Sequence, residues 1–311
     1  MSQRLLIDSL KAEKSAIEEL LEQAFQWNDP IGKAQFARKK EVIDAKLAKL
    51  IENPEKKASL VLFFGGEPVM GSRGISADFA GNILDKFQEL VNKFYARAEI
   101  GTLSERGPVP LQHSANLMIT QVAKGSFGFV LDELSDHDEL LDTSLKTVVE
   151  EVASTIKKTA SINDLDFEDV IDSLDHRTLI ALRDLFVDLD KNSATIRLLE
   201  EKFDYTLDHP SIQRGRRRTE STEIDEKEET IFATLQGFLP EHKKFEGRYN
   251  DESIYGSASK QAAEEIDRLI RSEEAVFTKN WELKVIHKTI TPLNRPPKEI
   301  YKLLELVRRV D

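Results

Sequence analysis

The chain has 311 residues, of which 40% are hydrophobic and 32% charged, and its formal net charge is −12. This composition is typical of a folded protein with about two domains, and the acidic charge disfavours generic attachment to nucleic acid or to an anionic membrane. The absence of cysteine excludes disulfides, thiolate metal sites and cysteine nucleophiles. We expect cytoplasmic residence, with no signal peptide, membrane partner, cofactor or metal site.

Residues 1–54 are predicted to form a helical hairpin. Apolar residues recur at helical spacing over 3–26 and again over 33–52. The segment WNDPIG between the two runs favours a turn. The apolar stripe is narrow, as in a coiled coil. The hairpin either covers the next domain or serves as an arm for self-association or for docking other protein subunits.

Residues 55–162 are predicted to form an α+β domain that begins with a first β-hairpin–helix unit. The run 60–64 has the β-favouring residues of a buried strand. Gly65 and Gly66 are interpreted as the hairpin turn, and EPVMGS as the returning partner strand. A helix with an apolar face follows and ends near residue 97.

A second β-hairpin–helix unit follows a loop rich in glycine and proline. NLMITQVA and FGFVLDEL are strand-like on either side of a KGS turn. A helix over about 137–160 follows, with Leu140 and Leu141 among its inward residues. The repeated order predicts one antiparallel sheet of about four strands with two helices covering one face.

The rest of the chain is predicted to be a helical bridge over 163–192 and a β-rich domain over 193–311. The bridge contains two apolar-periodic segments, and the β-rich part contains many short strand-like runs separated by turns. Closely spaced short strands favour a small barrel. The predicted fold class is therefore α+β: a helical hairpin, an antiparallel sheet with two covering helices, and a barrel-like C-terminal domain.

An arginine segment, defined by Arg214, Arg216, Arg217 and Arg218, stands between two of the β runs and precedes a block of acids. Its composition is that of a phosphate-binding cluster, but it lacks the aromatic residues that base stacking uses. In a helix over 209–221 the arginines can face a partner, whereas in a loop they pair with the acids. Three interpretations stay open: an inert solvated loop, contact with an acidic protein, and contact with nucleic acid.

A glycine-rich segment, GGEPVMGSRG, lacks the lysine of a phosphate-binding P-loop. Its second half can form a backbone nest for an anion, and the KGS turn can add contacts. The candidate anion site comprises Gly71, Ser72, Arg73, Gly74, Lys124 and Ser126. The six histidines form no H-x-x-x-H or H-x-H pair, and G-x-S-x-G does not occur. The sequence therefore points to no catalytic residue.

The hairpin NLMITQVAKGSFGFVLDEL resembles one in uncharacterised bacterial proteins encoded among anti-phage defence genes. The resemblance covers this hairpin alone and carries no functional residue over. It implies a bacterial cytoplasmic accessory factor.

We expect a non-catalytic interaction or sensing subunit of a bacterial cytoplasmic complex, in the defence context that the resemblance implies. The motivating pattern is segregated charge and an exposed helical surface without recognisable chemistry. One alternative is a nucleic-acid-binding subunit that uses residues 214–218 and the β-rich domain. Another is an enzyme of unfamiliar type with an inter-domain site near Arg73 and Lys124.

Overall fold

The computed structural model describes residues 3–101, 103, 107–123, 127–134, 141–272, 276–292 and 296–310. Their backbone divides into two compact units, one of 1–95, 111–157 and 188–212, the other of 96–110, 158–187 and 213–311. None of the described helices is both long and apolar enough to cross a bilayer.

The helices and strands follow one another as α1 (Gln3–Gln26), α2 (Pro30–Glu52), β1 (Ser59–Gly66), α3 (Ala77–Ile100), η1 (Gln112–Ala115), β2 (Met118–Ala123), β3 (Phe127–Asp132), α4 (Ser144–Ala160), α5 (Asp164–Ser173), α6 (His176–Lys191), β4 (Ala194–Leu199), β5 (Asp204–Leu207), α7 (His209–Glu220), β6 (Thr222–Leu239), η2 (Pro240–His242), β7 (Lys244–Tyr249), β8 (Glu252–Ala258), α8 (Lys260–Arg271), β9 (Asn280–Pro292) and β10 (Lys298–Val310).

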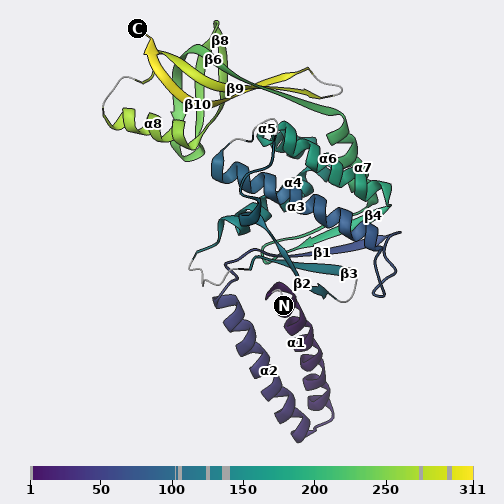
Figure 1. Ribbon diagram of the computed structural model, residues 1–311. Coiled ribbons are helices and arrows are strands. Elements are labelled where there is room, and N and C mark those ends of the chain that lie inside the picture. Colours follow the sequence, from purple (N-terminus) through teal and green to yellow (C-terminus); the bar gives the residue numbers. More distant parts are fainter. Residues whose placement is uncertain are drawn as a thin grey trace. The chain divides into compact units, whose positions relative to one another are not determined.

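The predicted helical hairpin is confirmed: α1 and α2 lie antiparallel, side by side (Figure 1). Ion pairs between Lys14 and Asp44 (2.6 Å) and between Lys40 and Glu18 (2.9 Å) cross from one helix to the other. Because these pairs match only one alignment of the helices, they favour the observed register. The core between the helices is formed by Ile7, Leu10, Ile17, Ile43 and Leu47.

The sheet of the first unit is antiparallel and has the strand order β2-β3-β1-β4-β5. It therefore has five strands rather than the expected four. The interpretation of Gly65 and Gly66 as a hairpin turn is wrong, because β1 runs through both and pairs with β4. Gly66 has φ +86°, and a Cβ there would lie 2.1 Å from the Ser193 carbonyl oxygen. The glycine thus permits a close approach between strands.

The segment EPVMGS does not return as a strand beside β1. Only Val69 and Ile75 form an isolated bridge within this region. Likewise, β4 and β5, which we placed in the C-terminal β-rich domain, complete the first sheet instead. Pairing between residues more than 100 positions apart, such as Phe64 with Ile196, leaves no local pattern in the sequence.

One face of the sheet is covered by α3 and α4, as predicted (Figure 1). Phe64 of β1 packs edge-on against Phe79 of α3, with 5.5 Å between ring centroids. On the opposite face, Val61 and Phe63 belong to a core cluster against which Leu5 of α1 packs. Both faces of β1 are buried, which explains its unbroken apolar run.

The helix expected over about 137–160 begins later, as α4 at Ser144. The Thr143 hydroxyl accepts a hydrogen bond from the Lys146 N–H at 3.1 Å, which is the geometry of a helix cap. Leu141 lies before this cap and is 79% exposed, so its assignment to the inward face is wrong. Leu140 is outside the described residues.

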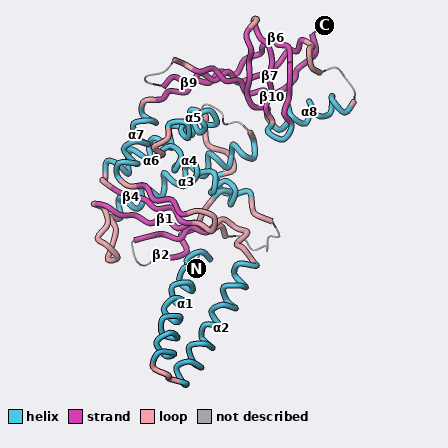
Figure 2. Tube along the Cα trace, turned by 180° about the vertical axis from the view of Figure 1, so that it is seen from behind, coloured by secondary structure: helices cyan, strands magenta, loops and turns pink. Residues whose placement is uncertain are grey.

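In the second unit, β6–β10 close into a five-stranded barrel with the order β10-β8-β7-β6-β9. Figure 2 shows these strands from behind. All neighbouring pairs are antiparallel except β8 with β10, which is parallel. Ala262, Ile266 and Leu269 of α8 belong to the same apolar core as the barrel strands. The predicted barrel-like C-terminal part is thus built from 222 onward.

Candidate functional site

The arginine segment lies on helix α7, so its interpretation as a solvated loop is wrong. Arg214 Nε donates to the Ala160 carbonyl at 2.9 Å. Arg218 donates to the carbonyls of Thr159 (2.9 Å) and Ser161 (2.7 Å), and pairs with Asp164. These carbonyls lie at the C-terminal end of α4, where they have no partner within the helix. Two of the four arginines are therefore caps of α4.

The other residues of the arginine segment differ in their surroundings. A Cβ on Gly215 would lie 2.4 Å from the Phe186 ring, so α7 packs closely on α6 at this point. Arg216 donates to Glu220 at 3.0 Å, one turn further along the helix. Arg217 alone of the four is exposed. The segment thus presents one outward arginine, which is a small basic surface for a polyanion.

Lysines of the barrel cap two more helices in the same manner. Lys288 Nζ of β9 donates to the Ile171 and Asp172 carbonyls at 2.8 and 2.9 Å, and also to Leu174, at the end of α5. Lys302 of β10 donates to the Gly101 carbonyl beyond α3. A cation is stabilised at a helix C-terminus by the helix dipole. Burial lowers the pKa of Lys288 to about 8, because a charged ammonium group is disfavoured away from water.

The predicted anion site lies only partly within the described residues. Gly71, Ser72 and Arg73 form an exposed turn, and the Arg73 N–H already donates to the Met70 carbonyl at 3.1 Å. Gly71 has the positive φ (+59°) that a nest uses, whereas Gly74 does not. Lys124 and Ser126 are outside the described residues. The anion site, and the enzyme site near Arg73 and Lys124, therefore stay predictions.

Three large apolar side chains are exposed where α1 meets α2: Phe25 (62%), Trp27 (75%) and Ile31 (69%). We call these three residues the hairpin tip. The turn itself is held by backbone groups and by other side chains, because the Asp29 side chain accepts from the Ile31 N–H at 3.0 Å and Gly32 packs against Ala24. The tip residues also lie outside the hairpin core. Their exposure is thus not required by the fold.

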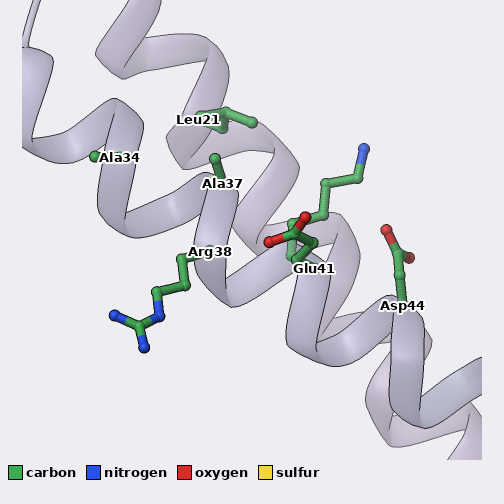
Figure 3. A pocket seen from close by; sticks show the side chains of 7 residues that line it. Leu21, Ala34, Ala37, Arg38, Glu41 and Asp44 are labelled. Carbon is green, nitrogen blue, oxygen red and sulfur yellow. The ribbon is translucent and has the colours of Figure 1, made fainter.

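A shallow groove of about 510 Å³ lies on the same hairpin (Figure 3). Leu21 of α1 and Ala37 of α2 lie across it from each other, and Arg38 extends away from them. Leu21 is one turn from Phe25, and Ala34 is three residues from Ile31. Residues at these spacings share a helix face, so the apolar floor of the groove continues toward the tip.

The edge strand β2 is also unprotected. Met118, Ile119 and Val122 are 45%, 55% and 52% exposed, and the strand contains neither a charge nor a proline. Edge strands normally carry such blocking residues, because an open edge can pair with another chain. The opposite edge, β5, has only four residues and carries Asp204, which pairs with Arg197 at 2.7 Å. The sheet thus has one protected and one open edge.

At one end of the barrel, a cavity of about 320 Å³ brings together residues from β7, β8, β10 and the β7–β8 turn. Its lining residues are Tyr249, Asn250, Glu252, Ser253, Ile254, Tyr255, Glu299 and Tyr301. Sequence reasoning missed this group, because about 50 positions separate its two halves and only the parallel pairing of β8 with β10 joins them. The hairpin tip, by contrast, had a local signal: bulky apolar residues beside a turn that does not need them.

Comparison of the chain with protein-family models, with curated proteins and with solved structures found no match.

Proposed function

We propose that the chain is a non-catalytic interaction subunit that docks through its hairpin tip onto an apolar surface of a partner chain, which is either another protein subunit or a second copy. The observation that carries the proposal is the exposure of the side chains of Phe25, Trp27 and Ile31 on a turn that does not need them for its hydrogen bonds. Clustered large apolar side chains on a protein surface mark interaction sites. Tryptophan and phenylalanine are also enriched at protein interfaces.

Backbone hydrogen bonds fix the conformation of the hairpin tip in the free chain. The Trp27 N–H donates to the Gln23 carbonyl at 2.9 Å, and the Asp29 N–H to the Ala24 carbonyl at 2.9 Å. Lys33 Nζ lies 4.9 Å from the centroid of the Phe25 ring. A rigid turn loses little conformational entropy on binding, so more of the apolar contact contributes to affinity.

The groove beside the tip supplies a polar rim. Arg38 and Glu41 line it, and neither makes an ion pair within the described part of the chain. An apolar centre with a rim of both charge signs is the usual anatomy of a protein interface. The assignment to an anti-phage defence complex rests on the sequence resemblance alone and is part of this proposal.

The proposal is tested by replacing all three tip residues with serine. Loss of Trp27 from such an interface should cost about 2 kcal/mol or more, which is about thirtyfold in Kd. Light scattering gives the mass of the purified particle and so detects self-association. Another partner is detected by tagged capture from the native host, followed by reconstitution of the purified pair. The matched control replaces Lys46, an exposed residue of α2 away from the turn.

We expect the triple variant to lose its partner, whether another protein or a second copy, and the Lys46 variant to keep it. A monomeric particle without any reconstituted partner, or a partner that binds both variants equally, contradicts the proposal. Circular dichroism of the variants checks that the hairpin remains folded. Because the tip lies outside the core, we expect unchanged helix content.

A second candidate function is nucleic-acid binding by the barrel. The observation that favours it is the topology of the strands. β6, β7 and β8 pair in chain order, and α8 follows β8 in the chain. β9 then pairs with β6, and β10 pairs in parallel with β8. This is the arrangement of OB-fold barrels, which bind oligonucleotides on the face of their second and third strands.

The surface of β7 is where this second function would be tested. Lys244 and Arg248 are exposed there, and Arg248 lies 3.9 Å from Asp251. Binding of a labelled single strand should fall when both basic residues become alanine and when salt rises, as counterion release requires. The absence of a gel shift at about 50 mM salt, where electrostatic binding is strong, removes this function.

A further inference from the structure

The cavity at the barrel end is lined by a tyrosine whose ring is buried and whose hydroxyl is open to solvent. Tyr301 is only 7% exposed and lines the cavity, and its hydroxyl makes no hydrogen bond with the described residues. Because the hydroxyl is open to solvent, it is hydrated when the cavity is empty, and a bound group can replace that water. The hydroxyl is therefore a group to which a ligand can donate.

The ring of Tyr301 stacks on a neighbouring aromatic ring. The imidazole of His287 stacks on it, with 4.6 Å between centroids and 1° between planes. His287 Nδ1 lies 3.3 Å from a carboxylate oxygen of Glu229, and Nε2 lies 3.4 Å from one of Glu299 without a hydrogen bond. The stacking thus orients the Tyr301 ring in the wall of the cavity.

The cavity is electronegative. Glu252 and Glu299 line it together with three tyrosines, and its lining contains no lysine or arginine. Glu252 makes no ion pair with any described residue. Burial raises the pKa of Tyr301 to about 12, and the charges of Glu299 and Glu229 act in the same direction. A negative charge or an anion would therefore be disfavoured at this point.

We propose that this cavity binds an organic cation: an ammonium or guanidinium group carried by a lysine or arginine side chain or by a small amine. Aromatic rings attract such cations through their faces, and carboxylates pair with them. The free hydroxyl of Tyr301 accepts a hydrogen bond from the same group. The inference concerns the barrel alone and does not depend on the hairpin tip.

A metal ion is a poorer match than an organic cation. In the described residues, no cluster of three histidine, aspartate or glutamate side chains is arranged to hold a metal. Divalent calcium and magnesium require six or more oxygen ligands in close geometry. A cavity of about 320 Å³ is instead at the lower end of the sizes that hold small organic ligands.

The test uses the full chain and three defined probes: N-acetyl-arginine amide, N-acetyl-lysine amide and spermidine. N-acetyl-citrulline amide, which has nearly the shape of the arginine probe without its charge, is the neutral control. Binding is followed by the NMR signals of the tyrosine rings and of His287. We expect at least one cationic probe to bind about tenfold or more tightly than citrulline amide, with binding weakened by salt.

Charge removal provides the second arm. Replacing Glu252 and Glu299 together with glutamine should weaken the cationic probe about tenfold or more. Tyr301→Phe keeps the stacked ring and should also weaken binding, without loss of stability, because the hydroxyl that it removes is open to solvent and bonds to none of the described residues. The matched control is Glu264→Gln on the exposed side of α8, which should bind as the wild type does.

The outcomes separate the sources of the cation. Tighter binding of spermidine identifies a free amine, and tighter binding of an amino-acid amide identifies a side chain of a protein. Equal binding of arginine and citrulline amides, an unchanged affinity in the double glutamine variant, or no binding of any cationic probe at about 10 mM overturns the proposal. Melting curves of all variants exclude unfolding as the cause of a loss.

Discussion

Replacing Arg218 with alanine should destabilise the second unit by about 2–3 kcal/mol. The side chain is only 12% exposed and donates to the carbonyls of Thr159 and Ser161, so the variant loses two charge-assisted hydrogen bonds at a helix end. Each contributes about 1.5 kcal/mol net, the lower end of the range for a charged donor, because the site is only part-buried. The pair with Asp164 adds little, because that carboxylate is 66% exposed.

Urea unfolding measures this change, with the fluorescence of Trp281 as the reporter. The only other tryptophan, Trp27, is replaced with phenylalanine to make the signal specific to the barrel. Arg217→Ala is the matched control, because that side chain is exposed, and it should change stability by less than about 0.5 kcal/mol. Equal and small losses in the two variants would refute the capping role of Arg218.

Three further predictions concern other parts of the molecule. Gly66→Ala should lower the free energy of unfolding by about 2 kcal/mol or more, because the residue has a positive φ and the added Cβ would lie 2.1 Å from the Ser193 carbonyl oxygen. Urea unfolding measures the loss, and an unchanged midpoint would contradict the prediction. Lys288 has a folded pKa of about 8 against 10.5 unfolded, so the unfolded state binds more protons between these values and stability should rise with pH across that window. Urea titrations at several pH values should show a smaller rise for Lys288→Met, and identical slopes would count against the assignment. Ile119→Lys on the open edge of β2 should leave the free energy of unfolding nearly unchanged and reduce aggregation on heating. Turbidity measures the aggregation, and an unchanged turbidity curve would mean that this edge does not pair with other chains.

Local patterns predicted the elements better than their partners. The hairpin follows from apolar spacing and a turn at Asn28–Gly32, and the buried run of β1 follows from its residue types. The assignment of β4 to the first sheet depends instead on pairing between distant residues, which no local pattern encodes. The local pattern therefore predicts a turn at Gly66, although the role of this glycine is to let two strands approach.

The candidate sites show the same limit. Composition identified the arginine segment, but whether an arginine binds a partner depends on what lies beside it after folding. Arg218 and Arg214 meet the end of α4, and only Arg217 stays exposed. Tyr301 and Tyr249 meet only because the barrel closes. In both cases, whether a side chain is available to bind a ligand or partner depends more on its tertiary contacts than on its residue type.

Photo-cross-linking at position 27 tests the central claim most directly. Benzoylphenylalanine replaces Trp27 in the native host, and the same group at Lys46 is the control, since both residues are exposed on the hairpin. The proposed function predicts one discrete protein adduct from position 27, whose mass identifies either a second copy or another subunit, and none from position 46. No adduct from position 27, or the same adducts from both positions, would contradict it.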